Sequence, residues 1–60
     1  MRLIRLEEVR NLTSLSRSAI YRKMKEKEFP QTVNLSDRSV AWVEEEIKSW
    51  IHDLIESRNE

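Results

Sequence analysis

The chain has 60 residues, and its 11 Lys and Arg residues balance its 11 Asp and Glu residues, so its formal net charge is zero. A chain of this length buries only about 60% of the surface that it exposes when unfolded, so we expect residues 1–60 to form a single small domain with one core. The absence of cysteine excludes a disulfide framework and a cysteine zinc site, and no apolar run approaches the ~20 residues that span a membrane.

The zero net charge hides an uneven distribution. Residues 1–42 carry nine cations and five anions, for a net charge of +4, whereas residues 43–60 carry two cations and six anions, for −4. This asymmetry indicates a basic working face and an acidic supporting end. An acidic final helix is also what a folded domain of this size would use simply to stay soluble.

The first segments predict a short extended piece and then a helix. Residues 2–5 alternate charged and apolar side chains only loosely, which favours either a short edge strand or an extended lead-in. In residues 6–13, Leu6, Val9 and Leu12 recur at helical spacing. Because this helix is short, its stability must come from packing.

Thr13, Ser14 and Leu15 form a connection of the size found at a helix-turn-helix corner. Leu15 is expected to fill the space between the two helices. Such a turn usually favours glycine, because φ is often positive there, and the chain has no glycine. Either Ser14 adopts a positive φ at some cost, or the turn differs.

Residues 16–27 predict a basic helix of about three turns with a net charge of +4. Ser16 is a good N-cap, and no glycine, proline or β-branched run follows it in this segment. Ile20 and Met24 lie on one face, opposite polar and basic side chains. A short, capped, basic helix with a narrow apolar seam suits the major groove of DNA. The alternative is a solvated surface helix.

A hairpin is predicted next. Phe29 and Pro30 end the second helix, because a proline disfavours helical geometry in the residue before it. Apolar and polar residues alternate through residues 31–42 on either side of a Ser-Asp pair, which is typical of a two-stranded hairpin with one buried face. A hairpin that follows a helix-turn-helix is called a wing. Arg38 is expected at or near its tip, and Trp42 in the core.

Residues 43–57 predict a final helix with a wide apolar stripe and three glutamates in its first turn, where the helix dipole favours anions. The stripe is expected to close the core and to leave some apolar surface for a second copy. Residues 58–60 are expected to fray. The members of the stripe are Val43, Ile47, Trp50, Ile51, Leu54 and Ile55.

Five segments in order carry a resemblance: LEEV at 6–9, LTSLSRSAIYR at 12–22, FP at 29–30, RSVAW at 38–42 and EIKSWI at 46–51. This series resembles the AlpA-like phage and prophage regulators, which are similar in turn to excisionases and to the N-terminal domain of MerR-type proteins. The resemblance covers nearly the whole chain. It implies a mainly α, winged helix-turn-helix fold with three helices and a small β-hairpin.

The resemblance also implies a function. Family members bind DNA and either activate transcription of a prophage integrase or excision gene, or bend DNA during excision. The chain departs from the family pattern at Ser14, Ser36, Asp37 and Ala41, where glycines are common. These departures concern the geometry of the turns.

Seven residues are therefore expected to contact DNA: Ser16, Arg17, Ser18, Tyr21, Arg22, Lys25 and Arg38. The N-terminal end of such a helix usually meets base edges, and arginine can pair two ways with guanine. Ser16 and Lys25 are assigned to phosphates. Tyr21 either contacts a phosphate through its hydroxyl or is a half-buried flank residue. Arg38 contacts a phosphate or the minor groove, unless it is only an exposed turn residue paired with Asp37.

The sequence gives little support for base stacking on single strands, metal binding or catalysis. Trp42 and Trp50 are expected in the core and not on single-stranded bases. His52 and Glu56 share a helix face, but two ligands do not make a metal site. The sequence offers no nucleophile with a partnering base and no glycine loop for a phosphate. We expect no enzyme, no cofactor and no metal.

The expected partner is double-stranded DNA. Because one copy offers an interface near the low end for specific DNA binding, we expect dimers or cooperative arrays on DNA. Integrase and RNA polymerase are candidate protein partners, and no membrane is expected. The location implied is the bacterial cytoplasm, on the nucleoid. Activation and excision stay open as alternatives, and a third hypothesis is a protein-interaction module that docks through its final helix.

Overall fold

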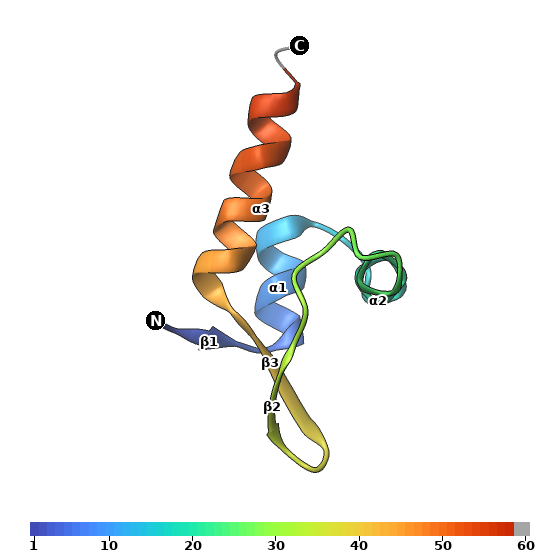
Figure 1. The fold of residues 1–60 in the computed structure, drawn as a ribbon, viewed down its shortest axis with the longest axis vertical. Coiled ribbons are helices and arrows are strands. Elements are labelled where there is room, and N and C mark those ends of the chain that lie inside the picture. Colours follow the sequence, from blue (N-terminus) through green and yellow to red (C-terminus); the bar gives the residue numbers. More distant parts are fainter. Residues whose placement is uncertain (59–60) are drawn as a thin grey trace.

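The computed structural model describes residues 1–58 (Figure 1). Its elements are β1 (Leu3–Ile4), α1 (Leu6–Thr13), α2 (Arg17–Lys25), β2 (Val33–Ser36), β3 (Ser39–Val43) and α3 (Glu44–Ser57). Three helices and a small antiparallel sheet confirm the predicted winged helix-turn-helix fold. Arg58 follows the last helix, and the fraying expected of residues 59 and 60 lies outside the described residues.

The sheet has the strand order β1-β3-β2, and both pairings are antiparallel. Of the two alternatives for the first residues, the edge strand is the one observed, with Ile4 opposite Trp42. The strand β3 is therefore central, and it leads directly into α3. This connection places the wing and the last helix on one continuous piece of chain.

One core joins every element except β2. Ile4, Val9, Ile20, Trp42 and Ile47 are almost completely buried in a single cluster, as is Phe29 after the second helix. Trp42 is the largest of these side chains, and its indole N–H donates to the carbonyl oxygen of Pro30 at 3.2 Å. The core position of Trp42 confirms its predicted role.

Of the two alternatives for the turn between α1 and α2, the positive φ at Ser14 is the one observed. Ser14 has φ 63° and ψ 15°, and its N–H donates to the carbonyl oxygen of Arg10 at 2.8 Å. This is the left-handed arrangement that commonly ends a helix, and it costs an L-residue roughly 1–2 kcal/mol. The hydroxyl of Thr13 supports the corner by donating to Val9 and accepting from the N–H of Leu15.

The second helix is shorter than predicted and ends at Lys25. Lys27 also has φ 63°. The N–H of Glu28 donates to the carbonyl oxygen of Lys23 at 2.8 Å, and that of Lys27 donates to Met24 at 3.1 Å. This pair of bonds is a Schellman motif, which ends a helix with a left-handed residue. The motif turns the chain two residues before the predicted end.

The hairpin differs from the prediction in two ways. Its turn is Asp37–Arg38 and not Ser36–Asp37, because Ser36 pairs with Ser39. The expected buried face is also wrong for β2, since Val33 is 40% exposed and Leu35 is 47% exposed. The helices α1 and α3 pack mainly against β3, which leaves β2 uncovered.

A bulge accounts for the altered hairpin register. The register shifts between Asn34 and Ser36, so Leu35 has no residue opposite it. Neither Asp37 nor Arg38 has the positive φ that favoured two-residue hairpins use. An extra residue in one strand increases the local twist and so accommodates a less favoured turn.

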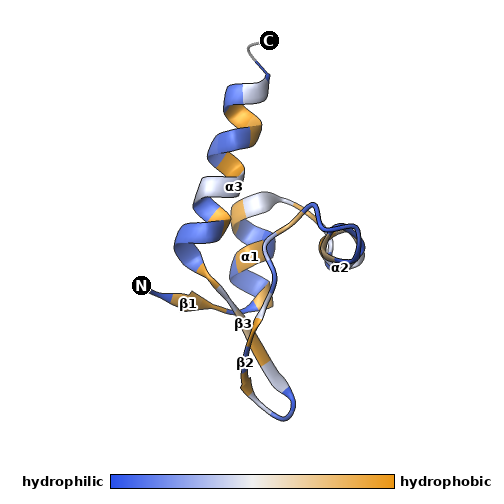
Figure 2. Ribbon diagram, in the orientation of Figure 1, coloured by the Kyte–Doolittle hydropathy of each residue, from blue (hydrophilic) through white to orange (hydrophobic). Residues whose placement is uncertain are grey.

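The last helix begins one residue later than predicted, ends at the predicted residue and carries the expected surplus of apolar surface. Ile47 is fully buried, whereas Leu54 is 53% exposed and Ile55 is 45% exposed. Apolar residues recur along α3 into its C-terminal half, which stands clear of the other elements (Figures 1 and 2). No helix within residues 1–58 has the length and apolar character required to cross a membrane.

Candidate nucleic-acid interface

The orientation of α2 is set at its start and along one side. The hydroxyl oxygen of Ser16 accepts a hydrogen bond from the N–H of Ala19 at 3.2 Å, which confirms the predicted N-cap. Ile20 is fully buried, and Met24 and Leu15 are half-buried against the core. The apolar seam therefore fixes which side of the helix faces outward.

The outward side of α2 is basic and accessible. Arg17, Ser18, Arg22 and Lys25 are all exposed. The structure records no ion pair between these cations and any carboxylate of residues 1–58. Their charge is thus not compensated by protein contacts, and their side chains are available to an anionic partner.

Tyr21 packs at the flank of the helix. Its side chain is 39% exposed, and its ring meets the indole of Trp42 edge-on, with ring centroids 6.2 Å apart and planes at 63°. The guanidinium of Arg17 lies 5.7 Å from the centroid of the Tyr21 ring, within range of a cation–π interaction. These contacts place Tyr21 at the flank of the helix, but the residue is exposed and not half-buried. They also link α2 directly to the wing.

Arg38 occupies the two-residue turn at the tip of the hairpin, as predicted, and it is exposed. The alternative of an ion pair with Asp37 is not found among the contacts of the described residues. The hairpin tip and the far end of α3 lie at opposite ends of the longest axis (Figure 1). The acidic helix is therefore directed away from the wing.

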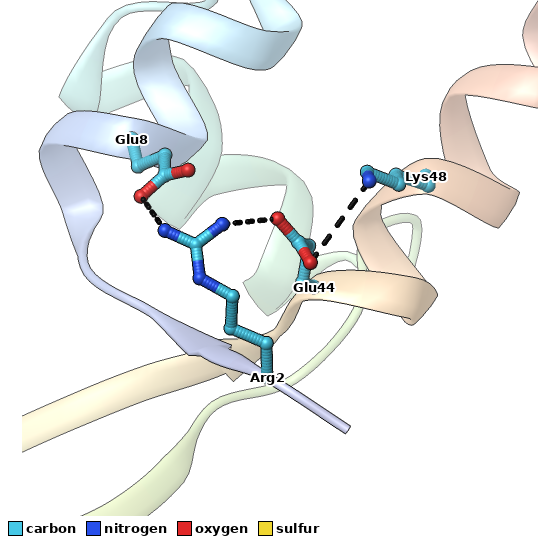
Figure 3. Close-up of polar contacts among 4 residues, drawn as sticks. All are labelled: Arg2, Glu8, Glu44 and Lys48. Atoms are coloured by element: carbon cyan, nitrogen blue, oxygen red, sulfur yellow. Dashed lines mark hydrogen bonds and ion pairs between the residues drawn. The ribbon is translucent and has the colours of Figure 1, made fainter.

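Arg2 belongs to the basic half of the sequence, but its charge is already paired with carboxylates. Its guanidinium contacts Glu44 at 2.6 Å and Glu8 at 3.2 Å, and Glu44 is also 3.9 Å from the ammonium of Lys48 (Figure 3). This network ties the start of the chain to α1 and α3. Arg2 therefore has a structural role, although it was counted with the cations of the basic half.

The remaining candidates for chemistry have structural roles. The indole N–H of Trp50 donates to the carbonyl oxygen of Glu28 at 2.9 Å, and its ring lies edge-on to Phe29 with centroids 4.7 Å apart. His52 and Glu56 face each other across one turn of α3, with Nε2 and Oε1 3.3 Å apart. Within residues 1–58, no three His, Cys, Asp or Glu side chains gather where they could hold a metal ion.

Comparison with known proteins identifies the family of the chain. The model of the family described as prophage CP4-57 regulatory protein (AlpA) matches residues 2–55. The uncharacterized protein ORF88 of Enterobacteria phage P4 is 40% identical over 57 residues, which make up 95% of this chain. The chain spans 65% of the length of that relative. The chain therefore belongs to the AlpA family of prophage regulatory proteins.

Proposed function

We propose that this chain is a sequence-specific DNA-binding transcriptional regulator of a prophage or similar integrated element, and that it activates an integrase or excision gene. The observation that carries the proposal is the outward face of α2, where Arg17, Arg22 and Lys25 are exposed and have no carboxylate partner within residues 1–58. A compact helix of this kind fits the major groove, which is about 12 Å wide.

The individual roles follow from position along the helix. Arg17 and Ser18 stand in the first turn of α2, the end that reads base edges in helix-turn-helix proteins. Arg22 lies one helical turn after Ser18, on the exposed side opposite Ile20 and Met24, and pairs with guanine. Lys25 binds a phosphate as a point charge. The Ser16 hydroxyl, whose oxygen already accepts the cap bond, still has a proton to donate to a phosphate.

Tyr21 and Arg38 complete the interface in different ways. Tyr21 holds Arg17 against its ring and so limits the orientations of that guanidinium. Arg38 extends from the hairpin tip to a phosphate or to the minor groove beside the site of α2. Because phosphate contacts fix the register of a protein on DNA, the wing sets the angle at which α2 enters.

The assembly on DNA follows from size. An interface made by one short helix and one hairpin is at the low end for specific recognition, so copies bind as dimers or in cooperative arrays. Residues 1–60 act as one DNA-binding domain without catalysis, in the bacterial cytoplasm on the nucleoid. Integrase and RNA polymerase are the protein partners that fit excision and activation respectively.

The test is a fluorescence anisotropy titration with DNA from around the gene itself and around the neighbouring integrase gene. It is run at about 50 mM and about 200 mM salt, with random DNA as competitor. Tight binding that resists the competitor and weakens at high salt supports the proposal. Binding no tighter than to random DNA contradicts it.

Footprinting of the DNA that binds tightly locates the protected site, and its position separates the two roles. Protection at a promoter supports activation, whereas protection at an attachment site, with a bend in the DNA, supports the excisionase alternative. Sedimentation of the complex gives the number of copies per site. One copy per site without cooperativity would contradict the assembly proposed above.

A further inference from the structure

An open groove of about 990 Å³ lies between α3 and the segment that joins α2 to β2. Its walls are mostly apolar and include Pro30, Val33, Val43 and Trp50. The hydrogen bond from the Trp50 indole to Glu28 and the edge-on contact of Trp50 with Phe29 hold the two walls together. The groove is therefore preformed.

Carboxylates surround the groove. Glu28, Glu45, Glu46 and Asp53 line it, and Lys27 is the one basic side chain among the described residues of the lining. None of these four carboxylates has an ion-pair partner within residues 1–58. The neighbouring Glu44 differs, because Arg2 and Lys48 already neutralise it (Figure 3).

This groove is separate from the proposed DNA interface. None of the seven residues assigned to DNA lines it, and its negative charge repels phosphates. The volume of the groove is near the upper end of the range for small-molecule pockets, and the groove is open to solvent. It therefore suits an extended segment of a polypeptide better than a compact small molecule.

We propose that the groove binds a short basic segment of a partner protein. A large apolar side chain of that segment packs against Trp50 and Val33, and Lys or Arg side chains on either side pair with Glu45 and Asp53. Apolar anchoring gives such a contact its affinity, and complementary charge gives it specificity and a fast encounter. The inference does not depend on DNA binding, so the two proposals fail independently.

The probe for the test is a synthetic peptide of about ten residues, with arginines on both sides of a central Leu-Phe pair. Two control peptides are matched to this probe. One carries glutamate in place of each arginine, and the other carries Gly-Ser in place of Leu-Phe.

Binding is followed through the indole N–H resonances of the ¹⁵N-labelled protein, because Trp50 lines the groove whereas Trp42 is fully buried. The expected result is saturable binding of the first peptide that shifts the Trp50 resonance. The Gly-Ser peptide should bind about tenfold more weakly or not at all, and the glutamate peptide should not bind.

Two double variants test the role of charge. Removal of two groove carboxylates by Glu45→Gln with Asp53→Asn is expected to weaken the peptide about three- to tenfold. The control, Glu7→Gln with Glu56→Gln, removes the same charge outside the groove and is expected to leave the affinity unchanged. Glu7 and Glu45 each lie in the first turn of a helix, so these two substitutions have similar helix-dipole effects. Glu56 lies in the last turn of α3 beside His52, so the free energy of unfolding of both double variants is measured as well.

Three results would overturn the inference. The first is an equal weakening of peptide binding in both double variants, because this would indicate only a general effect of net charge. The second is the absence of saturable binding or of a Trp50 shift. The third is displacement of the peptide at protein concentrations where the protein self-associates, because the groove would then belong to a second copy.

Discussion

The ring of Tyr21 on α2 meets the indole of Trp42 on β3 edge-on, with centroids 6.2 Å apart. Trp42 is the largest fully buried side chain, and its strand continues into the wing on one side and into α3 on the other. One aromatic contact thus couples the orientation of the basic helix to that of the wing. The two proposed DNA-contacting elements are therefore positioned by the same core residue.

Tyr21→Phe and Tyr21→Ala should separate the packing role of Tyr21 from a role of its hydroxyl. The phenylalanine keeps the contact with Trp42, so we expect DNA affinity within about twofold of the original. The alanine loses an aromatic pair worth about 0.5–1.5 kcal/mol beyond its buried area, so both stability and affinity should fall. Urea denaturation and anisotropy measure the two effects. A large loss of affinity in Tyr21→Phe alone would assign the hydroxyl to a phosphate.

Lys25→Ala should weaken DNA binding without changing sequence preference, and Arg38→Ala should do the same when Arg38 contacts a phosphate. A changed preference between A·T and G·C in Arg38→Ala would assign Arg38 to the minor groove. The plot of log K against log salt concentration has a negative slope, and each phosphate contact that is lost makes this slope less steep by about 1. The measurement is the salt dependence of affinity for specific and random DNA. Arg58→Ala serves as the control, because it removes one positive charge at the opposite end of the molecule. An equal change of slope in the control would indicate that only net charge matters.

Ser14→Gly should stabilise the fold. Glycine adopts a φ of 63° without the steric penalty that serine has there, which stabilises the folded state. The greater conformational freedom of glycine in the unfolded chain offsets part of this stabilisation. We expect the free energy of unfolding to rise by about 0.5–1 kcal/mol. The matched control is Ser49→Gly, within α3, which should lower it by about 0.5 kcal/mol. If Ser14→Gly destabilised the protein, the serine side chain would have a role that its backbone geometry does not show.

Ile47→Ala and Leu54→Ala should differ sharply although both lie on the same stripe of α3. Ile47 is fully buried, so its truncation should cost about 2–5 kcal/mol. Leu54 is 53% exposed, and its truncation should cost less than about 1 kcal/mol. Chemical denaturation at low and at high protein concentration measures both costs. A large cost for Leu54→Ala that appears only at the high concentration would show that a second copy covers this end of α3.

Local features of the fold could be predicted from the sequence. The bounds of α1, and those of α3 to within one residue, follow from apolar periodicity. A positive φ at Ser14 is one of two alternatives that the sequence leaves open. The hairpin register could not be predicted, because the bulge at Leu35 depends on a turn without positive φ. The early end of α2 at Lys25 depends on a Schellman motif that carries lysine where glycine is usual.

The candidate site also contains some features that could be predicted from the sequence and others that could not. The outward face of α2 could be predicted, because the positions of Ile20 and Met24 determine which cations point to solvent. The neutralisation of Arg2 by Glu44 could not, since 42 positions separate the pair in sequence. The contact between Tyr21 and Trp42 and the groove beside Trp50 also join separate segments. Periodicity within one helix contains no information about such pairs.

The most direct test of the DNA interface is the affinity of Arg17→Ala/Arg22→Ala for the protected DNA site, measured by anisotropy at fixed salt. The control is Lys48→Ala/Arg58→Ala, which removes the same charge from the acidic end of the chain. Each base-reading arginine should contribute about 1–3 kcal/mol, so the first variant should lose both most of its affinity and its preference over random DNA. The control should retain both. Unchanged affinity in Arg17→Ala/Arg22→Ala would contradict the assignment of α2 as the DNA-reading helix.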